Sequence, residues 1–138
     1  MAYDDPRFGV VQTIHMGTAK TKNTSVIGTR VEIDRKTMLT AVTVKDWNVQ
    51  VLDGATCTGG VNFNIALSKS LAGTGAVTPF GSAAVASQAD GSILDASVTT
   101  ETDLSAGDDL VLSYEVGTAL PAGALRVEAD VSYVERYT

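Results

Sequence analysis

Residues 120–138 read "LPAGALRVEADVSYVERYT", and this stretch decides the fold class. Between residues 125 and 133 every odd position is apolar and every even position is charged or polar. The apolar set is Leu125, Val127, Ala129, Val131 and Tyr133. A period of two puts alternate side chains on opposite faces of a β-strand, so the stretch predicts a strand with one buried and one wet face. A single strand buries little by itself, so this one requires a second layer.

The same alternation recurs along the chain between turn signals. It is clear in "VNFNIALSKS" at residues 61–70, and in residues 38–54 it changes parity at Lys45-Asp46, which predicts a bulge, a bend or a short turn there. Aromatic residues make up only 6% of the chain, and no long segment has a helical period. Short strands separated by turns every 8–12 residues predict an all-β sandwich or barrel of roughly seven to nine strands.

The first 25 residues differ from the rest. They contain Pro6, Gly9 and Gly17, one short apolar run, and then a polar, basic stretch. Neither a sustained period of two nor a helical period is present, so we expect an extended N-terminal arm over residues 1–25, able to pair as a short strand with a partner. The β-sandwich domain is expected over residues 26–138.

Charge is distributed unevenly along the chain. Residues 1–69 hold eight Lys or Arg against six Asp or Glu, a net of +2, and residues 70–138 hold two against ten, a net of −8, which together give the total of −6. Binding to nucleic acid needs a concentrated basic surface, so we expect no nucleic-acid partner. The asymmetry fits either solvated strand faces or a basic front end that docks on an acidic surface, such as a neighbouring copy.

Cysteine content and the N-terminal sequence bear on the compartment. The single cysteine, Cys57, excludes an internal disulfide framework and a cysteine-based zinc site. The N-terminus has no basic and apolar segments typical of a secretory signal, and no window resembles a transmembrane helix. We therefore expect a soluble chain that folds in a reducing cytosol, without a membrane partner.

Residues that carry chemistry are few. The only histidine, His15, lies in the expected arm, which leaves little basis for a metal site or a Ser-His-Asp triad. The acidic stretch at residues 101–109 fits a connecting turn, a calcium site or acid–base catalysis. The turn is favoured, with Gly107 at positive φ and Asp108 as its cap, because successive aspartates of a strand point to opposite faces. We expect no enzyme activity, no cofactor and no metal.

Trp47 is the remaining candidate for a binding residue. An exposed tryptophan is a platform for stacking a sugar ring, but Trp47 alternates with Val49 and Val51. We therefore expect it in the core or at a contact between subunits.

With these features the chain resembles the small jelly-roll cement or decoration proteins of tailed-bacteriophage capsids. The resemblance rests on the arm, on the paired runs "DLSAGDDLVLSYEVGTA" and "GALRVEADVSYVERY", and on the Gly/Ala/Thr/Ser-rich composition. It implies an antiparallel, jelly-roll-like β-sandwich that forms a homotrimer, binds the major capsid protein where capsomers meet, and stabilises the head. The implied place is the capsid exterior of a virion assembled in the host cytoplasm.

On this resemblance the arm contacts the capsid or a neighbouring subunit. Its candidate interface residues are Tyr3, Arg7, Phe8, His15, Lys20 and Lys22. The first alternative is a receptor- or glycan-binding module of a tail fibre or baseplate, which requires exposed aromatic side chains in the loops at one end. A hydrolase on a β-sandwich is a further alternative, and it requires two carboxylates that converge in a groove.

Overall fold

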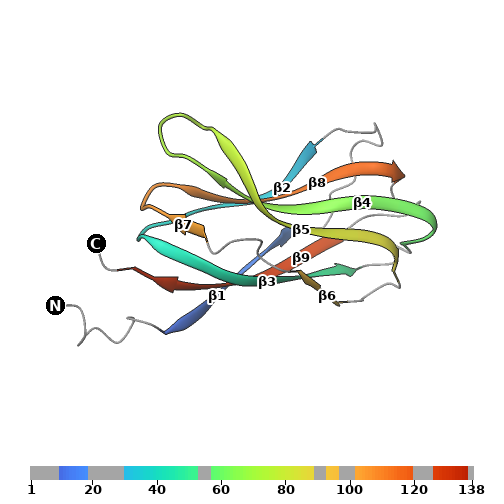
Figure 1. The fold of residues 1–138 in the computed structure, drawn as a ribbon, viewed down its shortest axis with the longest axis horizontal. Helices are drawn as coiled ribbons and strands as arrows, with labels where there is room; N and C mark the ends of the chain where they lie inside the picture. Colours follow the sequence, from blue (N-terminus) through green and yellow to red (C-terminus); the bar gives the residue numbers. More distant parts are fainter. Residues whose placement is uncertain are drawn as a thin grey trace.

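The computed structural model describes residues 10–18, 30–52, 57–88, 93–96, 102–119 and 126–136 (Figure 1). Within these ranges the chain forms nine β-strands. They are β1 (Val11–Thr18), β2 (Arg30–Thr37), β3 (Val42–Leu52), β4 (Cys57–Ser70), β5 (Val77–Gln88), β6 (Ile93–Ala96), β7 (Thr102–Leu104), β8 (Asp109–Ala119) and β9 (Arg126–Glu135). No helical segment in these ranges has the length and apolar character that a membrane crossing needs.

The strands form two antiparallel sheets that lie one over the other (Figure 1). The first sheet has the order β1-β9-β3-β6, with β7 also paired to β3, and the second has the order β2-β8-β4-β5. From β1 to β4 the chain alternates between the sheets, so neighbouring strands come from distant parts of the sequence. This connectivity is that of a jelly roll. The prediction of an antiparallel, jelly-roll-like β-sandwich is confirmed.

Strand β9, the stretch that indicated the fold class, lies between β1 and β3 in the first sheet. Its residues Val127, Ala129 and Val131 are buried, as their alternation predicts. The layer that covers them is the second sheet, whose β4 and β8 contribute the inward side chains. Those that are fully buried are Ile65, Leu67, Leu110, Leu112 and Tyr114.

Strand β3 contains the bulge that its change of parity predicts. Its pairing to β9 shifts register between Val44 and Asp46, so Val44 and Trp47 both face the core. Trp47 is 2% exposed, which confirms a packing role and excludes a free stacking platform. Its indole lies against Gly81 of β5, where a Cβ atom would come within 2.8 Å of Trp47 Nε1. The side chain is therefore accommodated because residue 81 has none.

Part of the expected N-terminal arm belongs to the first sheet. Strand β1 pairs along its whole length with β9 of the same chain, and Met16 is fully buried in the core. The period of two is hidden in the sequence because the polar Gln12 is partly buried while Val11 is exposed. The domain boundary at residue 25 lies outside the described residues and stays a prediction.

Candidate functional site

Three turns at one end of the sandwich are joined by Asp108. They are residues 38–41 between β2 and β3, residues 71–76 between β4 and β5, and residues 105–108 between β7 and β8. Asp108 is 6% exposed, and its carboxylate accepts hydrogen bonds from the backbone N–H of Ala72 (3.1 Å) and of Ser105 (2.9 Å). Its backbone carbonyl accepts the N–H of Met38 (2.9 Å). We call these three turns, together with the adjoining start of β1, the turn end.

The turn at residues 105–108 has the geometry that its sequence predicts. Gly107 has φ of 95°, in the left-handed region that favours glycine, and its N–H donates to Met38 O at 2.8 Å. Together with the Asp108–Ser105 bond, this confirms the prediction of a capped turn.

Asp109 points away from Asp108 and joins β8 to β2. Its carboxylate accepts hydrogen bonds from Thr37 Oγ1 (2.7 Å) and Arg35 Nη1 (2.6 Å), and these bonds hold the pKa of Asp109 below its ordinary value. Arg35 also donates to Glu32 at 2.7 Å. Asp108 and Asp109 thus each have structural partners. No group of three or more His, Cys, Asp or Glu side chains among the described residues is placed to hold a metal ion.

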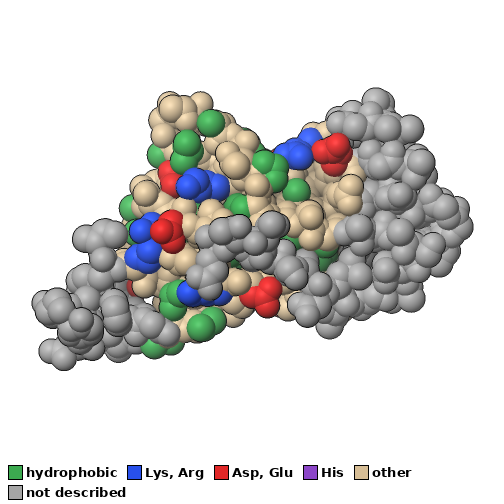
Figure 2. Space-filling model, in the orientation of Figure 1, with side chains coloured by type: hydrophobic (Ala, Val, Ile, Leu, Met, Phe, Trp, Pro, Cys, Tyr) green, Lys and Arg blue, Asp and Glu red, His purple; other side chains and the backbone are tan. Residues whose placement is uncertain are grey.

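The turn end gathers the exposed apolar side chains of the described part of the chain. The large hydrophobic residues that are exposed at the turn end or directly beside it are Val10, Val11, Leu39, Leu71 and Val77. Leu39 is 89% exposed and Val11 is 61% exposed. In Figure 2 hydrophobic side chains reach the surface at the left, over the β4–β5 hairpin, with charged side chains between them. These exposed apolar groups make this end of the sandwich the candidate surface for protein–protein contact.

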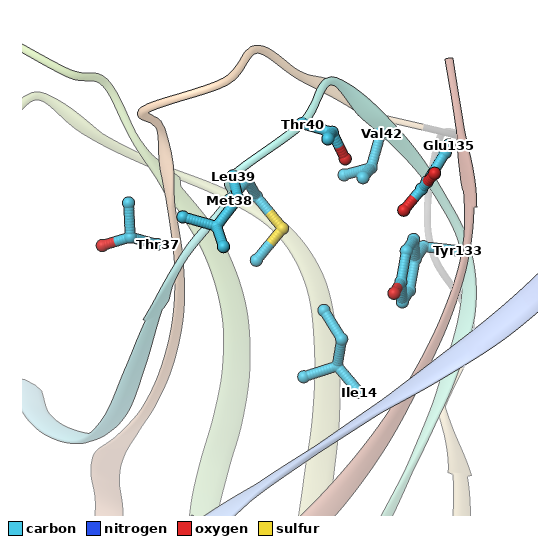
Figure 3. Close-up of a pocket in the computed structure, with 8 residues that line it drawn as sticks. All are labelled: Ile14, Thr37, Met38, Leu39, Thr40, Val42, Tyr133 and Glu135. Atoms are coloured by element: carbon cyan, nitrogen blue, oxygen red, sulfur yellow. The ribbon is translucent and has the colours of Figure 1, made fainter.

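A pocket opens at the turn end between the two sheets (Figure 3). Its volume is about 320 Å³. Ile14, Tyr133 and Glu135 of the first sheet form one side, and the β2–β3 turn forms the other with Met38 and Leu39. Five of the eight lining residues are apolar, and the other three are Thr37, Thr40 and Glu135. Such a lining suits an apolar or amphipathic protein side chain better than a strongly polar substrate.

His15 is the one predicted interface residue that the structure describes. It lies on β1 with its side chain 60% exposed, and its Nδ1 is 2.8 Å from Asp130 Oδ1 of β9. Its Nε2 is 3.6 Å from Glu128 Oε1. The hydrogen bond to Asp130, with a smaller contribution from Glu128, raises the pKa of His15 above 6.5. The surface placement fits an interface, and the contact itself stays a prediction.

The other predicted interface residues are not among the described ones. They are Tyr3, Arg7, Phe8, Lys20 and Lys22. Their role stays a prediction.

The turn end itself was not predicted from the sequence. Its members come from three turns and from the start of β1, which are up to about a hundred residues apart, and only the fold brings them together. The available signal was the presence of Leu39 and Leu71 in turns, where polar residues are usual.

Comparison with known proteins identifies a shared fold. No protein-family model and no curated protein sequence matches the chain. A chain from the capsid of Ralstonia phage GP4 is similar, with a TM-score of 0.61 and 16% identity over 95% of this chain and 88% of that chain. At this identity the similarity shows the fold alone, which is therefore one that also occurs in a phage capsid.

Two other solved structures are more distant. A chain from Bacillus endospore appendages, described as a family of disulfide-linked pili, has a TM-score of 0.41 and 13% identity over 93% of this chain and 88% of that chain. A chain of infectious bursal disease virus, Gt strain, has a TM-score of 0.29 and 14% identity over 94% of this chain and 42% of that chain.

Proposed function

We propose that this chain is a non-enzymatic virion protein, a cement or decoration protein that binds between capsomers of the major capsid protein on the exterior of a phage head. The observation that carries the proposal is the similarity to a chain of the phage GP4 capsid, because it covers most of both chains. The two chains are therefore alike in size as well as in fold. Fold similarity alone does not determine a function, so the proposal also needs a surface suited to the role.

The turn end supplies such a surface. The tip of the β4–β5 hairpin carries Leu71 and Val77, 38% and 45% exposed, on a turn held in place by the Ala72–Asp108 hydrogen bond. A rigid tip with apolar side chains is suited to insertion between capsomers. Each such contact is small, but a homotrimer presents three tips, and linked contacts bind far more tightly than one. We propose this tip as the contact with the major capsid protein.

The glycan-binding alternative gains no support from the described aromatic side chains. Trp47 and Tyr114 are buried, and Phe80 and Tyr133 are partly buried against the core. A sugar-stacking site needs an exposed ring. The described part of the turn end offers aliphatic side chains, which suit protein contact.

Binding to heads tests the proposal. Heads assembled from the major capsid protein of the genome that encodes this chain are mixed with the full chain and sedimented. We expect saturable binding of the wild-type chain, and at least tenfold weaker binding of the Leu71→Ser/Val77→Ser variant. Both residues are exposed, so the substitutions leave the fold intact. The matched control is Asn64→Ser/Ser82→Ala, which changes exposed residues outside the turn end.

Light scattering of the free chain tests the homotrimer separately. A mass of three copies supports it. Absence of binding of the wild-type chain to heads would overturn the proposed function.

A further inference from the structure

The corner of the sandwich between β1 and β2 is closed at one end and open at the other. Near the end of β1, Gly17 N–H donates to Asp34 Oδ2 of β2 at 3.0 Å, which joins the edges of the two sheets. Near the start of β1 the pocket of about 320 Å³ lies between them, with Ile14 on one side and Leu39 on the other. The edges therefore diverge toward the turn end.

Strand β1 is also an edge strand. In the described residues its first half pairs with β9 alone, which leaves the opposite side of its backbone free to pair with another chain. Val10 and Val11 are 49% and 61% exposed at this edge, and Leu39 is 89% exposed beside it. Proteins normally cover, shorten or charge such an edge, because it invites the addition of a strand.

We propose that this edge and its pocket bind the N-terminal arm of a second copy, which adds along β1 and places Phe8 in the pocket. This mode of binding takes its affinity from main-chain hydrogen bonds and its specificity from side-chain pockets. The inference rests on the homotrimer of the proposed function, in which each copy gives one arm and receives one.

The sequence and position of the arm favour it as the occupant. Residues 1–9 directly precede Val10, and Val10 lies at the same corner as the pocket. Extended, nine residues span up to about 30 Å, enough to reach a neighbouring copy. The arm carries the aromatic side chain of Phe8 for a mainly apolar pocket, and Arg7 beside it has the charge opposite to that of Glu135 in the lining.

A second copy is favoured over the arm's own copy because Phe8 precedes Val10 by only two residues. To add along its own β1, the arm would have to reverse its direction within Gly9, and a chain reversal normally takes about four residues. The arm of a neighbouring copy can reach the edge and the pocket without such a reversal.

Crosslinking between differently tagged copies tests the proposal. All proteins carry Cys57→Ser, and one carries Pro6→Cys in the arm while the other carries Thr40→Cys in the pocket lining, so that Phe8 and Leu39 are both kept. The two are mixed as full chains and treated with a short bis-maleimide. We expect a crosslinked heterodimer in at least tenfold higher yield than with Ser82→Cys, an exposed position on β5 outside the turn end, as the acceptor. Equal yields at the two acceptors would overturn the proposal.

A chain with both Pro6→Cys and Thr40→Cys separates the two sources of the arm. Crosslinks that form only within single copies show that the arm occupies its own pocket, which overturns the exchange. In addition, Phe8→Ala should weaken association at least tenfold in sedimentation, whereas Phe8→Tyr should retain it.

Binding to heads is measured on the same proteins, so that the two proposals fail separately. Wild-type chain that binds heads without crosslinking between copies refutes arm exchange and leaves the proposed function standing. Crosslinking between copies without binding to heads refutes the proposed function alone.

Discussion

At the scale of single residues, Asp108 connects turns that are far apart in the sequence. One carboxylate caps its own turn through Ser105 and fixes the β4–β5 hairpin through Ala72. Replacing Asp108 with Ala leaves two backbone N–H donors without these acceptors at a site that is 6% exposed. We expect a loss of about 1–3 kcal/mol in the free energy of unfolding, measured by urea denaturation.

An exposed carboxylate provides the comparison. Asp130→Ala removes only a surface contact with His15, so we expect a loss of less than about 1 kcal/mol. If both alanine variants lost the same stability, Asp108 would have no special role in the turn end.

His15 gives the molecule a measurable response to pH. Because its folded-state pKa is raised, its interaction with Asp130 stabilises the fold below the unfolded-state pKa near 6.5, and this contribution is lost as pH rises through the folded-state value. The chain has one histidine, so a single NMR titration reports its pKa. We expect a value above 6.5 that falls in Asp130→Asn.

The contribution of His15 to the stability of the fold should therefore be larger at low pH than at high pH. The difference in urea midpoint between the wild type and His15→Gln should be larger at about pH 5 than at about pH 8.5. Asp103→Asn, which alters a carboxylate bonded to Thr43, serves as the control and should leave the His15 titration unchanged. A wild-type pKa at or below 6.5 would contradict the Asp130 contact.

At the scale of elements, a strand with one buried and one solvent-exposed face could be predicted from the sequence wherever its buried residues are also its apolar residues. In β9 the buried positions 127, 129 and 131 are also the apolar ones, and in β3 the change of parity matched the bulge. Strand β1 breaks this correspondence, since Gln12 is partly buried and Val11 is exposed. Its place as an edge strand was therefore not predictable from periodicity.

Gly17 explains how β1 packs so closely on β9. A Cβ atom at this position would lie 2.6 Å from Val127 O and 3.0 Å from Glu128 Cα, and both of these are backbone atoms that cannot easily move. We therefore expect Gly17→Ala to displace the end of β1 and to cost about 1–3 kcal/mol. Hydrogen exchange should show faster exchange of β1 amides than in the wild type.

The control for this variant is Thr13→Ala, on the exposed face of the same strand. It should leave the protection of β1 nearly unchanged. Unchanged exchange in Gly17→Ala would mean that the strand has more room than the structure shows.

At the scale of the whole molecule, the candidate site depends on topology. The jelly-roll connectivity brings the turns at residues 38–41, 71–76 and 105–108 to one end, where Asp108 joins them. The cap at Asp108 could be predicted from the sequence because it joins two residues, Ser105 and Asp108, that are only three positions apart. It could not predict the partner Ala72, 36 residues away, because that contact exists only once both sheets have formed.

The packing of the two sheets depends on a complementary pair, Trp47 of β3 and Gly81 of β5. Since a Cβ atom at residue 81 would lie 2.8 Å from Trp47 Nε1, we expect Gly81→Ala to cost about 1–3 kcal/mol. Trp47→Phe lowers the stability by itself, but it removes that nitrogen and so makes room for a methyl group at residue 81. In the Trp47→Phe background the same Gly81→Ala change should therefore cost less than half as much, measured as a double-mutant cycle by urea denaturation.

The neighbouring exposed Ser82→Ala should cost nothing in either background. Equal costs of Gly81→Ala in both backgrounds would show that the indole does not set the spacing of the sheets.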